Sequence, residues 1–444
     1  MGGGLLQLVA CGAQDAYLSG NPQITFWKGL FKRHTNFAME PFRINFSGQP
    51  NWGTKQSAII GRHADLLYST YLEVVLPAYD NTKRDSYFFW NNDAGRLGYN
   101  LIKYAELEIG GQLIDRLYGE WMHLWNALTY DPAKSGKSNI MLTGPIADYE
   151  RDGSGGITGN IIDYASVRYA ADTECARPNN TLTGKPKLPN VLYIPLDFFF
   201  TRNPGAALPL IALQYHEVKI NILWNDNQHI AGNFNNASKA PSAIQAAIYI
   251  DYIYLDTEER RRMAQESHEY LIEQTQYNED KGISSYNNRI DLTFNHPVKE
   301  LVWVVQPTYY NNCNLAKAKS RQRLMPFTYG DSAVYKQSLQ INGQDRLDAR
   351  YGDYFNKVQP FQHHSGNAVQ AGIYMYSFAL RPEEHQPSGT CNFSRIDTAT
   401  LVMEMSGAVT IDESTDDTWD VRVYAVNYNI LRIMSGMAGL AYSN

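Results

Sequence analysis

The chain has 444 residues, of which 44% are apolar and 19% are charged, and its net charge is −6. This composition excludes a disordered chain and argues against a nucleic-acid-binding protein, which would need a basic surface. No apolar run approaches the ~20 residues that span a bilayer, and the first residues match neither a secretion signal nor a myristoylation pattern.

The first predicted elements are a Gly-rich extended arm at residues 1–24 and, from about residue 25, a series of β-strands. Apolar and polar residues alternate at 71–76 and 217–224, which is typical of strands with one buried face, and 248–255 is a Tyr-rich strand. Such segments occur in both halves of the chain, about eight in each. This number favours a jelly roll, in which two antiparallel sheets pack face to face.

A repeat divides the chain into two similar halves. The stretch that begins at Ile109 reads IGGQLIDRLYGEW, and INGQDRLDARYGDY begins 232 positions later. The pairs Gly110-Gly111 and Asn342-Gly343 predict two-residue hairpins, because a type I′ turn needs positive φ at both central residues. We therefore predict an all-β chain of two tandem eight-stranded jelly rolls (a double jelly roll), with long surface loops and a short connecting helix.

The connecting helix is predicted between the two halves, because residues 256–274 are the one good helix candidate. Within it, the triplet Arg260–Arg262 could bind phosphate, but the neighbouring glutamates favour a salt-bridged helix face. The expected division is an arm at 1–24, a first jelly roll at 25–257, a connector at 258–269 and a second jelly roll at 270–444.

Two stretches of the first half are predicted to be loops. Residues 130–190 are rich in Gly, Pro, Ser and Asn and form a long insertion, and residues 225–241 form a shorter one. Asn-x-Ser/Thr sequons begin at Asn45, Asn179, Asn236 and Asn392. Only Asn179 and Asn236 fall in predicted loops, so these two are the candidates for glycosylation.

Motifs that would carry chemistry are weak. Residues 131–138 resemble a phosphate-binding loop but lack its first glycine and its strand–helix context. His363 and His364 are adjacent and are expected to be solvated loop histidines, and the acidic residues at 412–417 favour a solubilising loop over a calcium site. The four cysteines have no metal-binding spacing and are expected to be free thiols. We therefore predict no catalytic residue, no metal site and no cofactor, although a carboxylate pair set by space stays open.

Blocks spread over the whole chain resemble the major capsid proteins of nucleo-cytoplasmic large DNA viruses, the double jelly-roll family of algal and amoebal giant viruses. Two of the blocks are long and specific: PSGTCNFSRID within 376–397, and NYNILRIMSGMAGLAY within 427–444. The others lie at 5–28, 33–40, 107–115, 203–220, 251–274, 294–303, 341–346 and 354–362. Together the blocks cover about half of the chain, in order and at both ends.

The resemblance implies a structural protein and not an enzyme. In the family, three chains form a homotrimer whose six lobes make a pseudo-hexameric capsomer, and capsomers tile an icosahedral shell. Neighbouring capsomers, a penton protein and minor capsid proteins on the inner face are the implied partners. No direct contact with nucleic acid is implied, and the internal membrane is met only indirectly. Residues 130–190 would lie on the virion exterior and the arm on the inner side. The protein would be made late and assembled in the infected cell, in cytoplasmic factories.

Two other functions compete with the capsid interpretation. A cupin-like or hydrolytic enzyme could use the same architecture, and it would reveal itself by bound metal or by turnover of glycans. A carbohydrate-binding module or viral spike would explain the aromatic residues and loops, and it would bind glycans without assembling into a lattice. The tandem repeat and the family blocks at both ends favour a capsid protein over both.

Overall fold

The computed structural model describes two compact units, residues 1–38 and residues 39–444. Within them it describes residues 2–27, 29, 31–76, 88–90, 97–129, 141–142, 190–226, 231–233, 244–308, 329, 334–366, 370–405 and 418–442. The N-terminal unit is not extended throughout, since it contains the short helices α1 (Gly3–Val9) and α2 (Ala16–Ser19), neither of which has a buried residue. Among the described helices, none is both long and apolar enough to cross a membrane.

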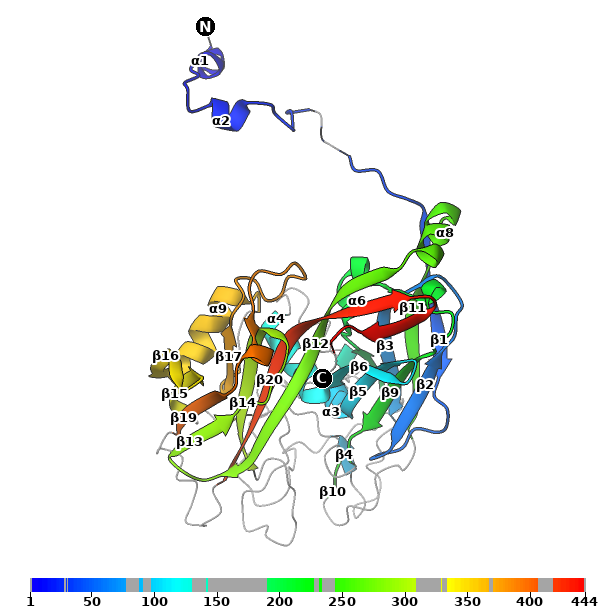
Figure 1. Cartoon of the computed structure of the whole chain (residues 1–444), viewed down its shortest axis with the longest axis vertical. Helices are drawn as coiled ribbons and strands as arrows, with labels where there is room; N and C mark the ends of the chain where they lie inside the picture. The colour runs from blue at the N-terminus through cyan, green and yellow to red at the C-terminus, as the bar shows by residue number, and fades with distance from the viewer. Residues whose placement is uncertain are drawn as a thin grey trace, which may run out of the picture. The chain divides into compact units, whose positions relative to one another are not determined.

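The first half of the larger unit is built on two antiparallel sheets (Figure 1). One has the order β1-β11-β3-β7, with the short strand β8 beside β3, and the other has the order β2-β9-β5-β6. The strands are β1 (Phe37–Asn45), β2 (Lys55–Ile60), β3 (Leu66–Leu76), β5 (Ile102–Ile109), β6 (Gln112–Tyr118), β7 (Asn190–Pro195), β8 (Leu208–Pro209), β9 (Val218–Trp224) and β11 (Gln245–Leu255). A separate pair joins β4 (Phe88–Trp90) to β10 (Ala231–Asn233).

The second half also has two antiparallel sheets. Their orders are β12-β20-β14-β17, with β18 and β21 added at the side, and β13-β19-β15-β16. The strands are β12 (His268–Ile283), β13 (Asn287–Asp291), β14 (Pro297–Pro307), β15 (Val334–Ile341), β16 (Gln344–Tyr351), β17 (Ile373–Ser377), β18 (Cys391–Asn392), β19 (Ala399–Met405), β20 (Trp419–Met434) and β21 (Met437–Leu440).

The two halves share one strand order. If the main strands of each half are numbered along the chain from first to eighth, one sheet reads 1-8-3-6 and the other 2-7-4-5, and this holds in both halves. A 1-8-3-6 sheet packed on a 2-7-4-5 sheet is an eight-stranded jelly roll. The predicted double jelly roll is therefore confirmed. Below, the sheet with order 1-8-3-6 is called the first sheet of its jelly roll.

Helices are short and connect the strands. They are α3 (Leu97–Asn100), α4 (Gly119–Thr129), α6 (Phe199–Arg202), α8 (Thr257–Gln265) and α9 (Gln359–His363), with 3-10 turns η2 (Pro204–Ala206), η3 (Leu210–Ala212) and η7 (Phe393–Arg395) and a π-helical turn η6 (Tyr354–Val358). Because α4 follows β6 and η6–α9 follows β16, each jelly roll has a helical segment after its fifth strand.

The predicted helix over 256–274 is correct only in its first part. Helix α8 begins after Asp256, whose side chain accepts a hydrogen bond from the backbone N–H of Thr257, and it ends at Gln265. From His268 the chain forms β12, which pairs with β20 along nearly its whole length. Tyr, Ile and Thr favour strands, and a long partner strand outweighs the helix propensity of the glutamates and glutamines.

The two repeat hairpins lie at equivalent points, between the fourth and fifth strands of each jelly roll. The φ angles are 58° and 85° at Gly110 and Gly111, and 50° and 76° at Asn342 and Gly343. Positive φ at both central residues is the geometry of a type I′ turn, and it explains why Gly and Asn stand there.

Candidate functional site: the interface between the two jelly rolls

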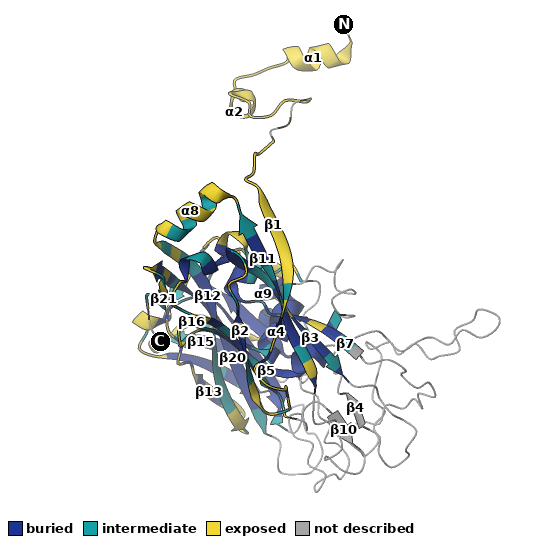
Figure 2. Cartoon of the chain, turned by 90° about the vertical axis from the view of Figure 1, so that its right-hand side faces the viewer, coloured by how far each residue is buried: buried dark blue, intermediate teal, exposed yellow. Residues whose placement is uncertain are grey.

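In the first sheet of the second jelly roll, β14, β17 and most of β20 are buried on both faces. Along β14, Leu301, Trp303 and Val305 pack into the core of their own jelly roll, whereas Val302 and Val304 belong to the hydrophobic core of the first. On the neighbouring strands Ile373, Met375, Tyr424 and Val426 also join that first core. Strands buried on both faces have continuous apolar sequences, which explains the stretch LVWVV at 301–305. The two jelly rolls thus meet through an apolar layer. Figure 2 shows in dark blue that most strand residues of both jelly rolls are buried.

A buried ion pair crosses this layer. Glu120, near the start of α4, accepts hydrogen bonds from Arg422 of β20 on both carboxylate oxygens, at 2.6 and 2.7 Å. The hydroxyls of Tyr424 and Tyr329 donate to the same carboxylate at 2.7 and 3.1 Å, and Arg422 also donates to Gln306 at 2.6 Å. Such a fork-to-fork pair fixes the orientation of both partners as well as their distance. It therefore sets how α4 lies on the second jelly roll.

Burial and charge shift the pKa values in this cluster. Burial alone would lower the pKa of Arg422, but the Glu120 carboxylate outweighs it and raises that pKa, so the guanidinium stays charged. Burial, and after it the charge of Glu120, raises the pKa of Tyr424 well above its usual value. Tyr277 has a raised pKa for the same reasons, and its ring lies 4.6 Å from that of Tyr118 across the interface. The tyrosines are therefore neutral hydrogen-bond donors and packing groups.

A second buried charge cluster surrounds Trp125 of α4. Glu273 of β12 accepts from Lys299 at 2.7 Å and from Arg202 of α6 at 3.0 Å. Lys299 is completely buried. The Arg202 guanidinium lies 4.5 Å and the Lys299 ammonium 5.8 Å from the centre of the Trp125 ring, within range of cation–π attraction. The first jelly roll contributes Arg202 and Trp125, and the second contributes Glu273 and Lys299, so this cluster too joins the halves.

Strand β6 of the first jelly roll lies against β12 of the second. The Asp115 carboxylate accepts from the backbone N–H of Thr275 at 3.1 Å, and the Gln274 amide donates to the Ile114 carbonyl. The backbone N–H of Arg116 also donates to the Asp115 carboxylate, at 2.9 Å. Burial raises the pKa of Asp115 to about 7, although the backbone N–H groups of Thr275 and Arg116 and the charge of Arg202 oppose the shift.

His364 holds a third buried cluster. Its Nε2 lies 2.9 Å from Glu300 and its Nδ1 lies 2.9 Å from Glu383, and its side chain is 1% exposed. Burial by itself would lower the pKa of His364, but Glu300 and Glu383 outweigh it and raise it to about 9. The backbone N–H of Gly366 then donates to the carbonyl of Leu128 at 2.7 Å. The segment 364–366 is therefore tied to the end of α4.

The C-terminal strand closes the interface next to the first repeat hairpin. The backbone N–H of Ala438 donates to His216 at 3.1 Å, and that of Leu440 donates to Gln112 at 3.4 Å. The Cα of Gly110 lies so close to the His216 ring that a Cβ there would overlap it. The first hairpin thus supports the contact between the halves through its neighbours, since His216, which packs on Gly110, and Gln112, which follows the turn, both bind the C-terminal strand.

Several sequence-based predictions can be compared with the structure here. The expectation that His364 is solvated is wrong, because two glutamates bury it. The salt-bridged helix face is correct, since Arg260, Arg261 and Arg262 pair with Asp65, Glu258 and Glu266 respectively. In the described part of the chain, no group of His, Cys, Asp and Glu side chains could hold a metal ion.

Other candidates lie outside the described residues: Asn179, Asn236, the stretch 131–138, the acidic stretch 412–417 and nearly all of the insertion 130–190. The clusters around Glu120, Glu273 and His364 were not predicted. Their sequence signal is a charge inside an apolar strand, as in VKELVWVV at 298–305 and DVRVYAV at 420–426. A charge in such a position has to find a buried partner.

Two family profiles match the chain. "Major capsid protein N-terminus" matches residues 25–256, and "Large eukaryotic DNA virus major capsid protein" matches residues 259–439. The chain belongs to this family. It is 44% identical to the major capsid protein of Pyramimonas orientalis virus and 41% identical to that of Phaeocystis pouchetii virus, over all of both chains in each case. Among solved structures, that of the PBCV-1 protein VP54 matches with a TM-score of 0.72 and 34% identity, covering 95% of this chain and all of that one.

Membership settles the broad function. The protein is a major capsid protein of a large DNA virus, and it builds the capsid shell of the virion. Its relatives are structural proteins and not enzymes, so the enzymatic alternative is not supported. The buried clusters described above therefore serve construction, because they fix the two jelly rolls in one arrangement.

Proposed function

We propose that three copies of the chain form a homotrimeric, pseudo-hexameric capsomer, and that these capsomers tile the icosahedral shell. One observation carries the proposal: the two jelly rolls share a strand order and contact each other through a large, core-like interface. Subunits that repeat one contact head to tail form a closed ring when the rotation between neighbours allows it. With two similar lobes in each chain, a ring of three chains has six lobes and fits a hexagonal lattice.

The remaining partners follow from the same proposal. The N-terminal arm faces the inner side of the shell, where it meets minor capsid proteins, and the internal membrane is reached only through them. Exposed apolar side chains in the arm support such a role, among them Leu8, Leu18 and Ile24. Neighbouring capsomers and a penton protein complete the shell, the protein is made late, and assembly takes place in cytoplasmic factories. No direct nucleic-acid contact and no cofactor enter the proposal.

The insertion at 130–190 is proposed to lie on the exterior, and its length and polar composition support this. Asn179 and Asn236 are the proposed glycan positions. Mass spectrometry of their peptides from virions tests this part, and unmodified peptides at both positions would contradict it.

The solution mass of the purified chain tests the trimer. We expect light scattering on a sizing column to give three times the 50.3 kDa chain mass, and we expect this value to persist on dilution, since obligate interfaces typically bury more than ~2,000 Å². A monomer at every concentration would contradict the proposal.

A further inference from the structure

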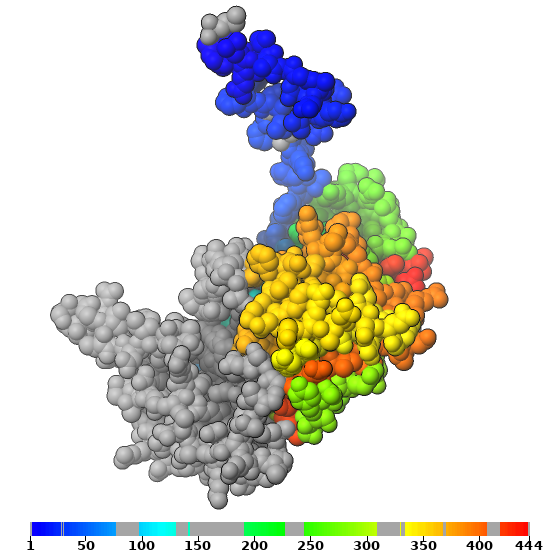
Figure 3. Space-filling view, turned by 90° about the vertical axis from the view of Figure 1, so that its left-hand side faces the viewer, coloured from blue at the N-terminus to red at the C-terminus, as the bar shows by residue number. Residues whose placement is uncertain are grey.

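The N-terminal unit, residues 1–38, has no hydrophobic core of its own. None of its described residues is buried, and Figure 3 shows its atoms, in dark blue, as an open chain. Large apolar side chains are exposed all along it, from Leu5 in α1 to Phe37 at the start of β1. Apolar surface is unfavourable in water, so a run of such side chains indicates a partner outside the unit.

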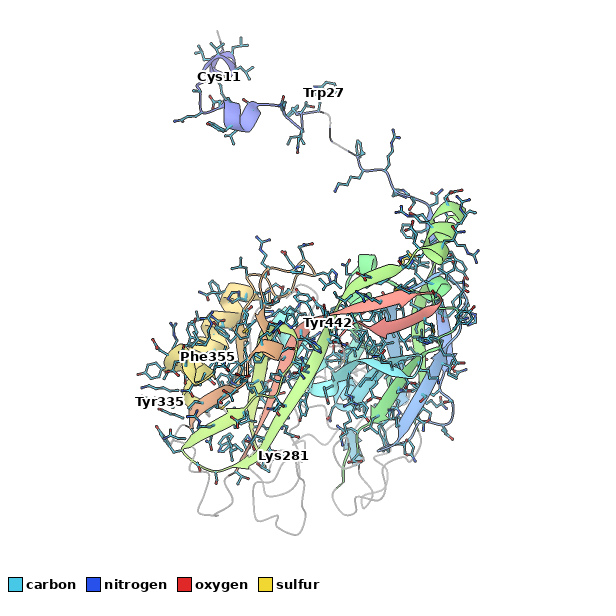
Figure 4. The ribbon with its side chains drawn as sticks, in the orientation of Figure 1. Cys11, Trp27, Lys281, Tyr335, Phe355 and Tyr442 are labelled. Carbon is cyan, nitrogen blue, oxygen red and sulfur yellow. The ribbon has the colours of Figure 1, made fainter. Side chains whose placement is uncertain are left out.

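Aromatic and cationic side chains are concentrated in residues 26–34, where the sequence reads FWKGLFKRH. Trp27 is 84% and Phe31 95% exposed, and Phe26 is fully exposed. Trp27, labelled in Figure 4, projects from the backbone of this stretch. We call residues 26–34 the aromatic–basic segment. It presents rings and charges together on one short piece of exposed chain.

The aromatic–basic segment is cationic, although the chain as a whole is acidic with a net charge of −6. Lys28, Lys32 and Arg33 carry its charge, and the nearest acidic residues along the chain are Asp15 and Glu40. The side chains of Lys32 and Arg33 are exposed. Because salt screens exposed charges beyond about 8 Å, the local charge and not the net charge decides what such a segment attracts. The segment therefore attracts an anionic partner.

We propose that the aromatic–basic segment binds the surface of an anionic lipid bilayer. Aromatic rings lie at the boundary between hydrocarbon and head groups, while Lys and Arg side chains extend from there to anionic head groups. The segment is far shorter than the ~20 residues that cross a bilayer, so it lies on the membrane and does not span it. Its three cations are fewer than in a typical polybasic stretch, so the rings supply part of the affinity and binding is reversible.

The aliphatic side chains of the same unit favour a bilayer over nucleic acid. Single-stranded nucleic acid would stack its bases on the aromatic rings and pair its phosphates with the cations. It would leave the exposed Leu5, Leu6 and Val9 of α1 and the exposed Ile24 in water. The interface of a bilayer accepts aliphatic side chains as well as aromatic ones. A lipid surface therefore accounts for all of the exposed apolar residues, and nucleic acid accounts for only some of them.

The inference goes beyond the proposed function and does not depend on the trimer, because each chain carries the whole segment. In the finished shell, residues 1–24 are proposed to meet minor capsid proteins, and the internal membrane is then reached only through these. The bilayer contact belongs to chains that have not yet joined the shell. Its effect is to gather such chains on a membrane surface, where they meet one another at a raised local concentration.

Flotation of the full chain with lipid vesicles tests the inference. We expect binding to vesicles of phosphatidylcholine mixed with phosphatidylserine, and much weaker binding to phosphatidylcholine alone or at high salt. The double variant Lys32→Glu, Arg33→Glu should bind the mixed vesicles at least tenfold more weakly, since each cation near the surface contributes about fivefold. The matched control is Arg261→Glu, Arg262→Glu, because these arginines of α8 are also exposed but are paired with glutamates. Thermal melting shows whether each variant is folded.

Fluorescence shows which part of the chain enters the bilayer. Lipids brominated on their acyl chains quench tryptophans that contact them. Of the tryptophans whose side chains the structure describes, Trp27 is the one that is exposed. We expect brominated mixed vesicles to quench part of the fluorescence of the unchanged chain, and we expect Trp27→Phe to remove this quenching while it keeps most of the binding.

Several results would overturn the inference. One is an unchanged chain that does not float with the mixed vesicles, and another is equal flotation of the Lys32→Glu, Arg33→Glu variant. Quenching that survives Trp27→Phe would place another part of the chain in the bilayer. A single-stranded oligonucleotide that binds the chain more tightly than the vesicles do, and releases it from them, would assign the segment to nucleic acid. All of these results leave the mass of the trimer unchanged, so the proposed capsomer is tested separately.

Discussion

Glu120 is the residue on which the junction of the two jelly rolls depends most directly. It accepts four hydrogen bonds, from Arg422, Tyr424 and Tyr329, and all of these donors lie in the second half of the chain. The Arg422 and Glu120 side chains are only 8% and 12% exposed. Removing one partner of such a pair leaves a buried charge without compensation, which costs far more than the pair itself contributes.

We expect Glu120→Ala to lower the free energy of unfolding by about 3–5 kcal/mol. The matched control is Glu258→Ala, which removes an exposed pair with Arg261 and should change stability by no more than about 1 kcal/mol. Urea unfolding of both variants beside the unchanged chain measures the difference. Equal midpoints for the two variants would show that the buried pair has no special weight.

His364 makes stability depend on pH. Its pKa is about 9 in the folded chain and about 6.5 in an unfolded one, so folding favours the protonated ring. The stabilisation is complete below pH 6.5 and is lost as the pH rises through 9, and it amounts to about 3 kcal/mol. The pKa of Asp115 is raised to about 7, so this residue also makes the folded chain less stable as the pH rises. Its effect is confined to the range from about pH 4 to pH 7.

We therefore expect thermal stability to fall between pH 7.5 and 9, and His364→Gln to remove most of that fall. His363→Gln, one residue away, is the control and should keep the slope of the unchanged chain. Melting temperatures at half-unit pH steps measure both. A His364→Gln variant with an undiminished slope would assign the effect to another group.

At the scale of single elements, the shared glycine after the fifth strand has a steric reason. A Cβ at Gly352 would lie 2.5 Å from the carbonyl oxygen of Val334, and a Cβ at Gly119 would overlap the carbonyl oxygen of Ile102. Val334 and Ile102 are the first residues of equivalent strands, β15 and β5. The helical segment of each jelly roll thus starts where the backbone passes directly over the fourth strand.

We expect Gly352→Ala to lower the free energy of unfolding by about 1–3 kcal/mol, the usual cost of overpacking. Gly439→Ala is the control, because the nearest atom to a Cβ there is the end of the Gln112 side chain at 3.5 Å, an ordinary contact. Chemical unfolding compares the two. Equal stability would mean that the backbone moves aside at little cost.

The second repeat hairpin gives a conformational test. A Cβ at Gly343 meets open space, but φ there is 76°, which a β-branched residue resists. We expect Gly343→Val to disturb the turn between β15 and β16 and to reduce the yield of soluble trimer. An unchanged melting temperature together with an unchanged trimer mass would contradict this expectation.

At the scale of the whole molecule, the sequence predicted the architecture better than the junction. The hairpins, the strand alternation and the repeat are local patterns, so they could be found in one half and matched in the other. Pairs such as Glu120 with Arg422 or Arg202 with Glu273 join residues far apart in the chain and are set by the packing of two jelly rolls. The sequence shows a charge within an apolar strand, as at Lys299, but not the partner that it meets.

The apolar layer between the two jelly rolls has a consequence during synthesis. The first jelly roll leaves the ribosome before the strands that will cover Trp121, Trp125 and Leu128 exist. At about 5–20 residues per second, the stretch 270–444 takes roughly 9–35 s to make, and for that time a large apolar face is bare. We expect residues 39–257 produced alone to aggregate or to bind a hydrophobic dye, whereas the same segment supplied with residues 258–444 should become soluble. A chain that depends on its own second half in this way has a reason to engage a holding chaperone while it is being made.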